Sequence, residues 1–414
     1  MNILFALHQF FPRHYTGTER LVLNLSKQMQ RMGHSVNVLT YGITEDEGFT
    51  QHDSGFYIKE YEYQGVPVIS IRHELITAES DLTIFDLTME KIVSKNISRA
   101  KFDIVHVCHA MRIGVIIKVA RKKNIPVVLT LTDFWLMCPK GIAVTPDGQL
   151  CLNSENGNKC LSKCYESNLK SRIKRRVHDL AEVNKSVDCV VSATKFMKQV
   201  YAHSSFSSEI KLNPFGIDYS NVRKNQKTYS SDSDITLGFM STLVEHKGAH
   251  ILLNAFNQAK MNNIRLKIYG DYFGQNRYYD ILKDMAMDND KVEFLGSYKY
   301  EDMPDILDGI DALVVPSTWW ENSPLVLLRA LAHNVPAIVS DLGGLTESVT
   351  DGENGFTFEA GNAESLAKVL RKIGKDPVIL NDLKARIQPP PRVEEEAFAY
   401  ERIYAGLVKK DELT

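Results

Sequence analysis

The feature that most constrains this chain is a repeated alternation of short apolar runs with amphipathic stretches. In the first half, apolar runs typical of buried strands occupy residues 2–7, 36–39, 104–108, 127–131 and 189–193. Between them, apolar residues recur at helical spacing, as in residues 21–32 and 112–123. Strands that alternate with helices predict an α/β domain built on a parallel, doubly wound sheet.

The same rhythm restarts in the second half of the chain. Further apolar runs occupy residues 235–240, 265–269, 292–295, 312–315 and 337–340. The polar segment 221–234 separates the halves and is predicted to be a linker. We therefore expect two Rossmann-like domains, residues 1–220 and 221–392, with a C-terminal helix at 393–414 that packs back on the first. Because ligands bind outside the carboxyl ends of parallel strands, we expect the two sheets to face each other across a ligand-binding cleft.

Composition narrows the classes of partner. The chain has 414 residues, of which 44% are hydrophobic, which is enough for two packed cores. Its net charge of −2 gives no overall basic field, so no nucleic-acid partner is expected. No apolar run reaches the roughly 18 residues of a membrane span, and the first residues lack a basic leader, so we expect a cytoplasmic protein.

Two local patterns predict free backbone N–H groups at helix starts. Thr16 and Glu19 have the spacing of a capping box, which would place Gly17 in the first turn of a helix. In the second half, Ser323 is a good N-cap and Pro324 a good first helical residue. Backbone N–H groups at such a helix start can bind a phosphate.

Two charged residues accompany the second of these helix starts. Glu321 lies just before it, where a carboxylate could bind the hydroxyls of a sugar carried on a diphosphate. Lys247 follows a predicted strand and precedes a glycine and a helix, a position from which an ammonium could neutralise a departing diphosphate. The alternatives are a solvated glutamate beside a capped helix and an ordinary surface lysine.

The segment 317–328, followed by Gly343-Gly344 and Glu347, resembles the donor-binding region of the family 4 retaining glycosyltransferases, which have the GT-B fold. The segments 16–19, 31–34, 216–218 and 245–248 extend the resemblance in the expected order. It implies transfer of a sugar from a nucleotide-diphosphate donor to the hydroxyl of a glycan or lipid-linked acceptor, with no cofactor for catalysis, as in polysaccharide or lipopolysaccharide synthesis. It implies catalytic roles for Glu321 and Lys247, and donor contacts at Gly17, Thr242, Asn322, Ser323, Pro324, Leu325, Arg329 and Gly344.

The chain departs from the family pattern at three positions. Thr242 stands where many members have an arginine that would assist the diphosphate. Arg329 stands where the family has a glutamate that accepts hydrogen bonds from ribose, and a guanidinium cannot accept one. Arg329 could instead contact a phosphate, lie on the helix surface, or mark impaired binding. Thr132 replaces a family histidine, and the loop Thr132-Asp133-Phe134-Trp135 resembles that of a subgroup with a four-cysteine insertion. Asp133 then becomes the candidate catalytic polar group near the acceptor, unless it merely fixes its loop.

These departures leave three functions open. The chain could be an active retaining glycosyltransferase, a GT-B protein that binds nucleotide or glycan without catalysis, or a sugar-nucleotide epimerase.

A basic stretch suggests a further partner. Residues 169–178 combine five lysines and arginines with Leu169, Ile173 and Val177 at helical spacing. Such a helix could lie on an anionic membrane surface that carries the acceptor, which would make the protein peripheral at the inner face of the membrane. The alternative is an ordinary solvated helix face.

Four cysteines crowd into one polar stretch, at Cys138, Cys151, Cys160 and Cys164. Four thiolates can form a tetrahedral structural zinc site, and a loop with few apolar residues needs such a cross-link. Unbound thiols and disulfides are the alternatives. Cys108 and Cys189 lie in predicted strands and are expected to be small buried residues.

Overall fold

The chain forms two compact units. The computed structural model describes residues 1–43, 48–75, 82–204, 206, 209–272, 274–287 and 289–411. The first unit comprises Met1–Phe215 with Val393–Thr414, and the second comprises Gly216–Arg392. This boundary lies before the expected one at residue 220, because Ile217 pairs with Arg392 and the Tyr219 hydroxyl donates to the Pro390 carbonyl.

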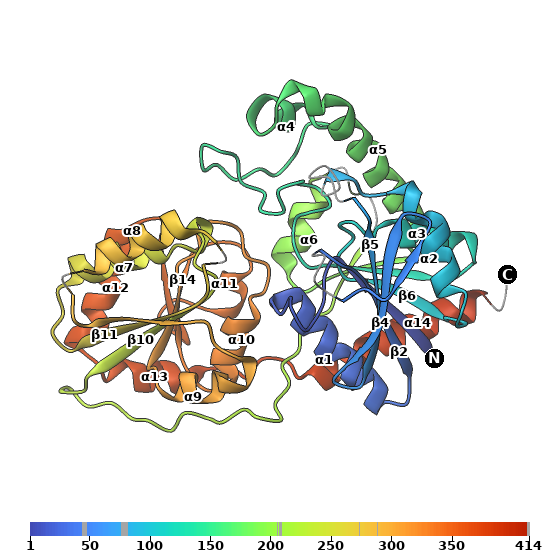
Figure 1. Cartoon of the computed structure of the whole chain (residues 1–414). Coiled ribbons are helices and arrows are strands. Elements are labelled where there is room, and N and C mark those ends of the chain that lie inside the picture. Colours follow the sequence, from blue (N-terminus) through green and yellow to red (C-terminus); the bar gives the residue numbers. More distant parts are fainter. Residues whose placement is uncertain are drawn as a thin grey trace. The chain divides into compact units, whose positions relative to one another are not determined.

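A nine-stranded sheet forms the centre of the first unit (Figure 1). Its strands lie in the order β3-β4-β5-β2-β1-β6-β7-β8-β9. Their bounds are β1 Asn2–Leu7, β2 Ser35–Tyr41, β3 Gln51–Asp53, β4 Phe56–Tyr63, β5 Val66–His73, β6 Ile104–Val107, β7 Val127–Leu131, β8 Cys189–Ser192 and β9 Ile210–Leu212. All five strands predicted in this half are present, and β1 pairs in parallel with both β2 and β6.

The expectation of an all-parallel sheet is wrong at one edge of this unit. Strand β4 is antiparallel to both β3 and β5. Gln64 and Gly65 both have positive φ, 51° and 83°, and form a two-residue turn that returns the chain beside β4. Strand β4 alternates buried and more exposed residues along its first half, as expected for a sheet edge with one face on the core.

Most helices of the first unit pack around its sheet. The helices are α1 Gly17–Arg31, α2 Glu90–Ile97, α3 Val115–Lys122, α4 Asn158–Lys163, α5 Lys170–Ser186, α6 Lys195–Ala202 and α14 Val393–Asp411, with 3-10 turns η3 Leu87–Met89 and η4 Ser167–Leu169. Helix α4 contacts α5. Helix α14 belongs to this unit because its Ala397, Tyr400 and Tyr404 are buried in the core of the β1 sheet. The Tyr404 hydroxyl lies 2.6 Å from Nδ1 of His106 on β6.

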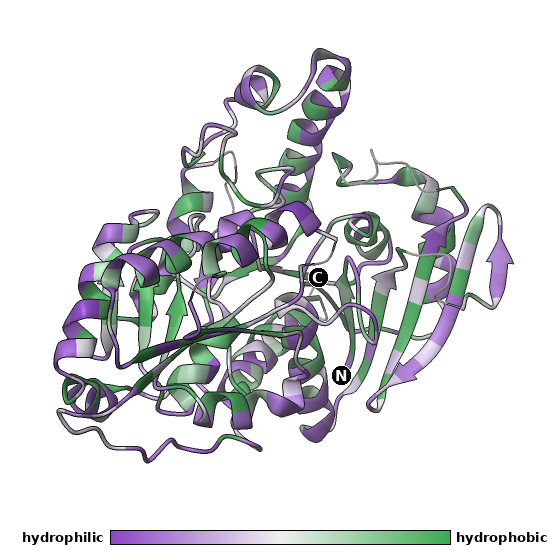
Figure 2. Cartoon of the chain, turned by 60° about the vertical axis from the view of Figure 1, so that its left-hand side comes forward, coloured by the Kyte–Doolittle hydropathy of each residue, from purple (hydrophilic) through white to green (hydrophobic). Residues whose placement is uncertain are grey.

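The second unit is a parallel sheet of six strands in the order β12-β11-β10-β13-β14-β15. The strands are β10 Ile235–Met240, β11 Ile264–Tyr269, β12 Val292–Gly296, β13 Ala312–Val315, β14 Ala337–Ser340 and β15 Gly355–Phe358. The helices are α7 Ala249–Ala259, α8 Asn276–Ala286, α9 Met303–Asp308, α10 Leu325–Ala332, α11 Leu345–Ser348, α12 Ala363–Lys375 and α13 Ile379–Arg386, with 3-10 turns η5 Glu245–Lys247 and η6 Tyr300–Asp302. Hydrophobic residues concentrate on the strands and on one side of the helices around them (Figure 2).

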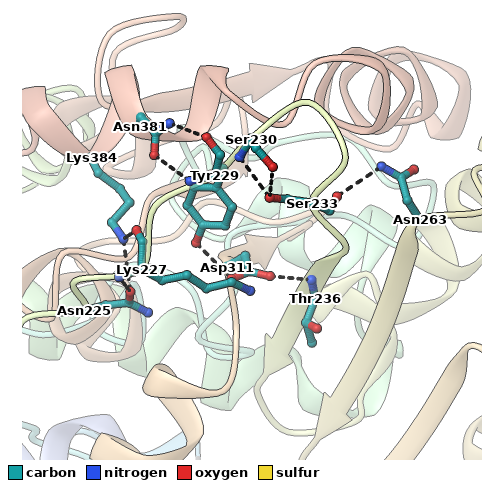
Figure 3. Close-up of polar contacts among 10 residues, drawn as sticks. All are labelled: Asn225, Lys227, Tyr229, Ser230, Ser233, Thr236, Asn263, Asp311, Asn381 and Lys384. Carbon is teal, nitrogen blue, oxygen red and sulfur yellow. Dashed lines mark hydrogen bonds and ion pairs between the residues drawn. The ribbon is translucent and has the colours of Figure 1, made fainter.

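The prediction that residues 221–234 are a linker is wrong. This segment lies along the second unit and is held there by side chains distant in sequence (Figure 3). The Asp311 carboxylate accepts hydrogen bonds from the Lys227 ammonium at 2.7 Å and the Tyr229 hydroxyl at 2.8 Å. The side chain of Asn381 bonds both the N–H and the carbonyl of Tyr229. We call this segment, residues 221–234, the strap. Its composition alone cannot distinguish it from a linker, because the partners of its polar residues lie far away in the sequence.

Among the parallel strands of each unit, the strand order reverses at one point. In the second unit the reversal lies between β10 and β13, and in the first it lies between β1 and β6. Ligands of doubly wound sheets bind outside the carboxyl ends of the strands at such a switch point. Among the described residues, no helix is both long and apolar enough to cross a membrane.

Candidate functional site

The loops that follow β10 and β13 meet at the switch point of the second unit. Gly248 ends the η5 turn with φ of 75°, and a Cβ there would lie 1.8 Å from the Pro316 carbonyl oxygen. Only glycine allows this approach. The Thr318 N–H also donates to the His246 carbonyl at 2.9 Å. The loop carrying Lys247 is therefore fixed against the loop that leads to Glu321.

Glu321 and Lys247 lie together in this place. The Lys247 ammonium donates to Glu321 Oε1 at 2.7 Å, and the Ser317 hydroxyl and Trp319 indole donate to the same oxygen at 2.7 and 2.8 Å. The side chains of Glu321 and Lys247 are 8% and 21% exposed. The alternatives of a solvated glutamate and an ordinary surface lysine are therefore wrong.

The electrostatics of this pair keep Glu321 ionised at neutral pH. Burial raises the pKa of a carboxyl, but the Lys247 charge and the three hydrogen bonds outweigh it, so the pKa of Glu321 lies below its ordinary value. Among the described residues, no hydrogen bond ends on Oε2. One carboxylate oxygen is therefore anchored, and the other remains able to accept a hydrogen bond from a ligand.

Helix α10 begins one residue later than expected. Pro324 has ψ of 121° and is the N-cap, and its carbonyl accepts from the N–H groups of Leu327 and Leu328. Ser323 is thus not the cap, because the extended Pro324 starts the hydrogen-bonding pattern itself. The helix start, with its N–H groups at Leu325 and Val326, still follows closely after Glu321. The Gly344 N–H donates to the Glu321 carbonyl at 2.8 Å, so this glycine fixes the position of Glu321.

Arg329 is an interior residue. It is 1% exposed, so the helix-surface alternative is wrong. Its Nη1 donates to the Asp218 carbonyl at 2.6 Å and to the Tyr300 hydroxyl at 3.0 Å, and its Nη2 donates to Asn221 Oδ1. The guanidinium therefore ties the start of the second unit to helix α10. A role in donor binding stays a prediction.

A second polar cluster lies at the switch point of the first unit. His8 follows β1 and His109 follows β6, and their ring centroids are 3.9 Å apart. His109 Nε2 lies 2.9 Å from Asp133 Oδ2, in hydrogen-bonding distance. Burial, followed by the nearby charge of His109, lowers the pKa of His8 well below its ordinary value, so His8 is neutral at pH 7.

Asp133 also fixes its own loop. Its Oδ1 accepts from the Trp135 N–H at 2.8 Å, while the Thr132 hydroxyl donates to the Cys108 carbonyl at 2.8 Å. The two histidines were not among the predicted site residues. A usable signal was present, because each directly follows a predicted strand and the carboxyl ends of parallel strands lie at one edge of the sheet.

The capping box at the start of α1 is not formed. The helix begins at Gly17, as expected, with Thr16 as N-cap. However, the Thr16 hydroxyl donates to Glu19 Oε2 at 2.6 Å rather than accepting from the backbone. Glu19 is fully buried and points toward His8, with Oε1 3.8 Å from Nε2 of that ring. The Thr16 hydroxyl bonds Glu19 instead of the backbone because the buried Glu19 carboxylate needs a hydrogen-bond donor.

Two family models match consecutive parts of this chain. The model described as Glycosyltransferase Family 4 matches residues 15–221, and the one described as Glycosyl transferases group 1 matches residues 221–388. The chain belongs to glycosyltransferase family 4. Expectations about the subgroup with a Thr-Asp-Phe-Trp loop and four cysteines stay predictions.

Relatives and solved structures agree with this assignment. This glycosyltransferase is 24% identical over 408 residues to an uncharacterized glycosyltransferase of Methanocaldococcus jannaschii, covering 93% of each chain. It is 24% identical over 363 residues to an uncharacterized protein in the cps region of Klebsiella pneumoniae, covering 84% of this chain and 87% of that protein.

Among solved structures, sucrose-phosphate synthase from Thermosynechococcus elongatus has a TM-score of 0.75 at 18% identity, covering 99% of both chains. The Anabaena protein HepE in complex with UDP and glucose has a TM-score of 0.70 at 18% identity, covering 98% of this chain and 100% of that one. These similarities show the GT-B fold.

The basic stretch 169–178 of this glycosyltransferase does not present a free amphipathic face. Ile173 is 1% exposed and Arg176 is 4% exposed, so both lie in the interior. Lys174 donates to the Asn156 carbonyl, and Arg175 pairs with Asp179 at 2.8 Å. The apolar residue at the centre of the stretch is thus packed on its own unit, and a membrane contact stays a prediction that rests on the remaining exposed charges alone.

The six cysteines of this glycosyltransferase are all free thiols in the described chain. Cys108 and Cys189 are 1% and 8% exposed, as expected for small buried residues. The other four line a single cavity.

Proposed function

We propose that this glycosyltransferase moves a sugar from a nucleotide-diphosphate donor to an acceptor hydroxyl with retention of configuration at the anomeric carbon. In this proposal no metal takes part in catalysis, and the product belongs to a surface polysaccharide or a glycolipid. One observation carries it: the buried Glu321 and the partly exposed Lys247 form an ion pair at the switch point of the second unit, close to the start of α10.

Binding of the nucleotide-sugar donor would break the ion pair between Lys247 and Glu321. The Lys247 ammonium then turns to the diphosphate, whose negative charge grows as the sugar leaves. The N–H groups of Leu325 and Val326 would assist it, since a helix start favours an anion. Glu321, anchored through Oε1, would accept hydrogen bonds from sugar hydroxyls on Oε2.

The chemical step then needs no protein nucleophile. The bond between the acceptor oxygen and the anomeric carbon forms while the bond from that carbon to the phosphate oxygen breaks. The acceptor proton passes to the departing phosphate oxygen on the same face of the sugar, which gives retention. The protein supplies position and charge stabilisation. The UDP and glucose named for HepE, and the cps region named for the Klebsiella relative, support this class of donor and product.

The first unit would hold the acceptor near Asp133 and His109. We expect Asp133→Asn to lower the rate of transfer at least about tenfold, because losing a hydrogen bond from the acceptor to a charged carboxylate costs about 1.5–3 kcal/mol. An asparagine can still accept from the Trp135 N–H, so the loop should keep its shape. The measurement is transfer to acceptor compared with slow hydrolysis of the donor, which should not change.

Two further variants separate a role in transfer from a role in holding the loop: Asp133→Ala, and the control Glu182→Gln. The alanine variant also loses the loop contact, and Glu182 is a partly exposed glutamate on α5 that serves as control. If Asp133 only fixes its loop, Asp133→Asn will transfer sugar like the wild type and only Asp133→Ala will fail.

The proposed function as a whole is tested with a panel of UDP-, GDP-, dTDP- and ADP-sugars in the presence of EDTA. We expect one nucleotide class to raise the melting temperature and to be slowly hydrolysed, with the anomeric configuration retained in the product. Absence of any shift would contradict the proposal. Loss of activity in EDTA, restored by a divalent cation, would contradict metal independence.

The second candidate function is a GT-B protein that binds nucleotide or glycan without catalysis. The observation that favours it is Arg329, which stands where the family has an acceptor for ribose. Both of its terminal nitrogens donate within the protein, to Asp218, Tyr300 and Asn221. A melting-temperature shift without hydrolysis or transfer would support this candidate.

A further inference from the structure

Four cysteines of the first unit converge on one cavity. Cys138, Cys151, Cys160 and Cys164 all line it, together with Lys140 and Lys159. Cys160 lies in α4 and Cys164 caps that helix, so the two are one turn apart on the same face. The other two come from the loop after β7 and from the following coil. The fold thus brings these four thiols to one place, although they are spread along the segment.

A buried cation without a described carboxylate partner lies near the cavity. Arg176 on α5 is 4% exposed, and its guanidinium donates to the carbonyls of Leu82, Trp135 and Leu136. Within the described chain no carboxylate pairs with it. A buried cation needs a compensating negative charge, and four neutral thiols supply none.

The segment that carries the cysteines has little structure to hold it. Between β7 and α4 it forms one isolated bridge, Val144 with Leu150, and several turns. It contacts α5 near Gly157. Gly157 has φ of 82°, and a Cβ there would lie 2.7 Å from a methyl carbon of Ile173 on α5. The loop is thus seated on the helix that carries Arg176.

We propose that Cys138, Cys151, Cys160 and Cys164 form a structural zinc site. A zinc ion with four thiolates carries two net negative charges, which would compensate Arg176 and suit the neighbouring lysines. As the described side chains stand, no group of three or more is arranged to hold a metal ion. Binding therefore draws the sulfur atoms together to about 2.3 Å from the metal, with release of the thiol protons. The cross-link would fix the 138–164 loop on α5.

The test is the metal content of the full chain, purified with a non-thiol reductant and passed through EDTA. We expect about one equivalent of zinc per chain, released when a mercurial reagent modifies the thiols. Cobalt added to the zinc-free protein should give the absorption of a tetrahedral thiolate site. Cys160→Ser should hold at least about tenfold less zinc, whereas Cys189→Ala, a buried cysteine in β8, should hold as much as wild type.

The alternatives predict different results. Less than about half an equivalent of zinc with all six thiols reactive after denaturation would overturn the proposal in favour of free thiols. Fewer reactive thiols in protein purified without reductant, with no zinc, would overturn it in favour of disulfides. Should Cys160→Ser not fold, the zinc release and the cobalt spectrum of the wild type decide by themselves.

Discussion

Glu321→Gln and Lys247→Ala are each expected to lower turnover at least about a hundredfold, the scale of losing one electrostatic contact in a transition state. Glutamine keeps the shape of Glu321 but not the charge that strengthens its hydrogen bonds to sugar hydroxyls. Alanine at 247 removes the ammonium that would stabilise the departing diphosphate. The measurement is turnover at saturating donor and acceptor.

Stability must be followed with these two variants. Lys247→Ala leaves the buried Glu321 carboxylate without its counter-charge, which costs about 3–5 kcal/mol for a fully buried pair and less here, because Lys247 is 21% exposed. Turnover is therefore measured below the melting temperature of each variant. Glu353→Gln and Lys375→Ala, both exposed in the second unit, are the matched controls and should behave as wild type. Unchanged turnover in Glu321→Gln would remove that residue from the site.

The second large effect concerns stability. Arg329→Met is expected to lower the free energy of unfolding of the second unit by about 3 kcal/mol, because it removes charged donors from Asp218, Tyr300 and Asn221, each worth about 1.5–3 kcal/mol but not additive. At roughly 2–4 °C per kcal/mol for a domain of this size, the melting temperature should fall by about 10 °C.

The control for this variant is Arg371→Met. Arg371 pairs with the half-exposed Glu364, and such a surface pair is worth less than about 1 kcal/mol. Nucleotide affinity is compared at a temperature where all variants are folded. A large loss of affinity with an unchanged melting temperature would show that Arg329 contacts the donor phosphate rather than holding the fold.

Much of the fold could be predicted from short windows of sequence. The apolar runs at β1, β7, β10, β13 and β14 coincide with the predicted strands residue for residue. The edge formed by β3, β4 and β5 was not predicted. Its hairpin turn, at Gln64 and Gly65, is a recognisable local signal, but the choice between antiparallel edge and parallel core depends on which strand lies beside it.

The candidate site was predicted in part. The sequence and its family resemblance indicated Glu321 and Lys247, and the structure brings them to 2.7 Å. It also shows two features that no local pattern predicts: Arg329 is an interior residue, and the rings of His8 and His109 lie 3.9 Å apart. The 221–234 segment is a strap on the second unit because Asp311 and Asn381 satisfy its polar groups.

Sequence by itself determined the central strands of both sheets and which charged residues stand at their ends, because periodicity and turn chemistry act over a few neighbouring residues. Only the tertiary structure decided which of these ends meet. That depends on strand order, and here the pairing of β10 with β13 and of β1 with β6 joins residues far apart in the chain. Long-range packing also decides which group pairs with a buried charge. Lys247 and Arg329 are similar as isolated cations, but Lys247 pairs with the Glu321 carboxylate and Arg329 donates to neutral oxygens.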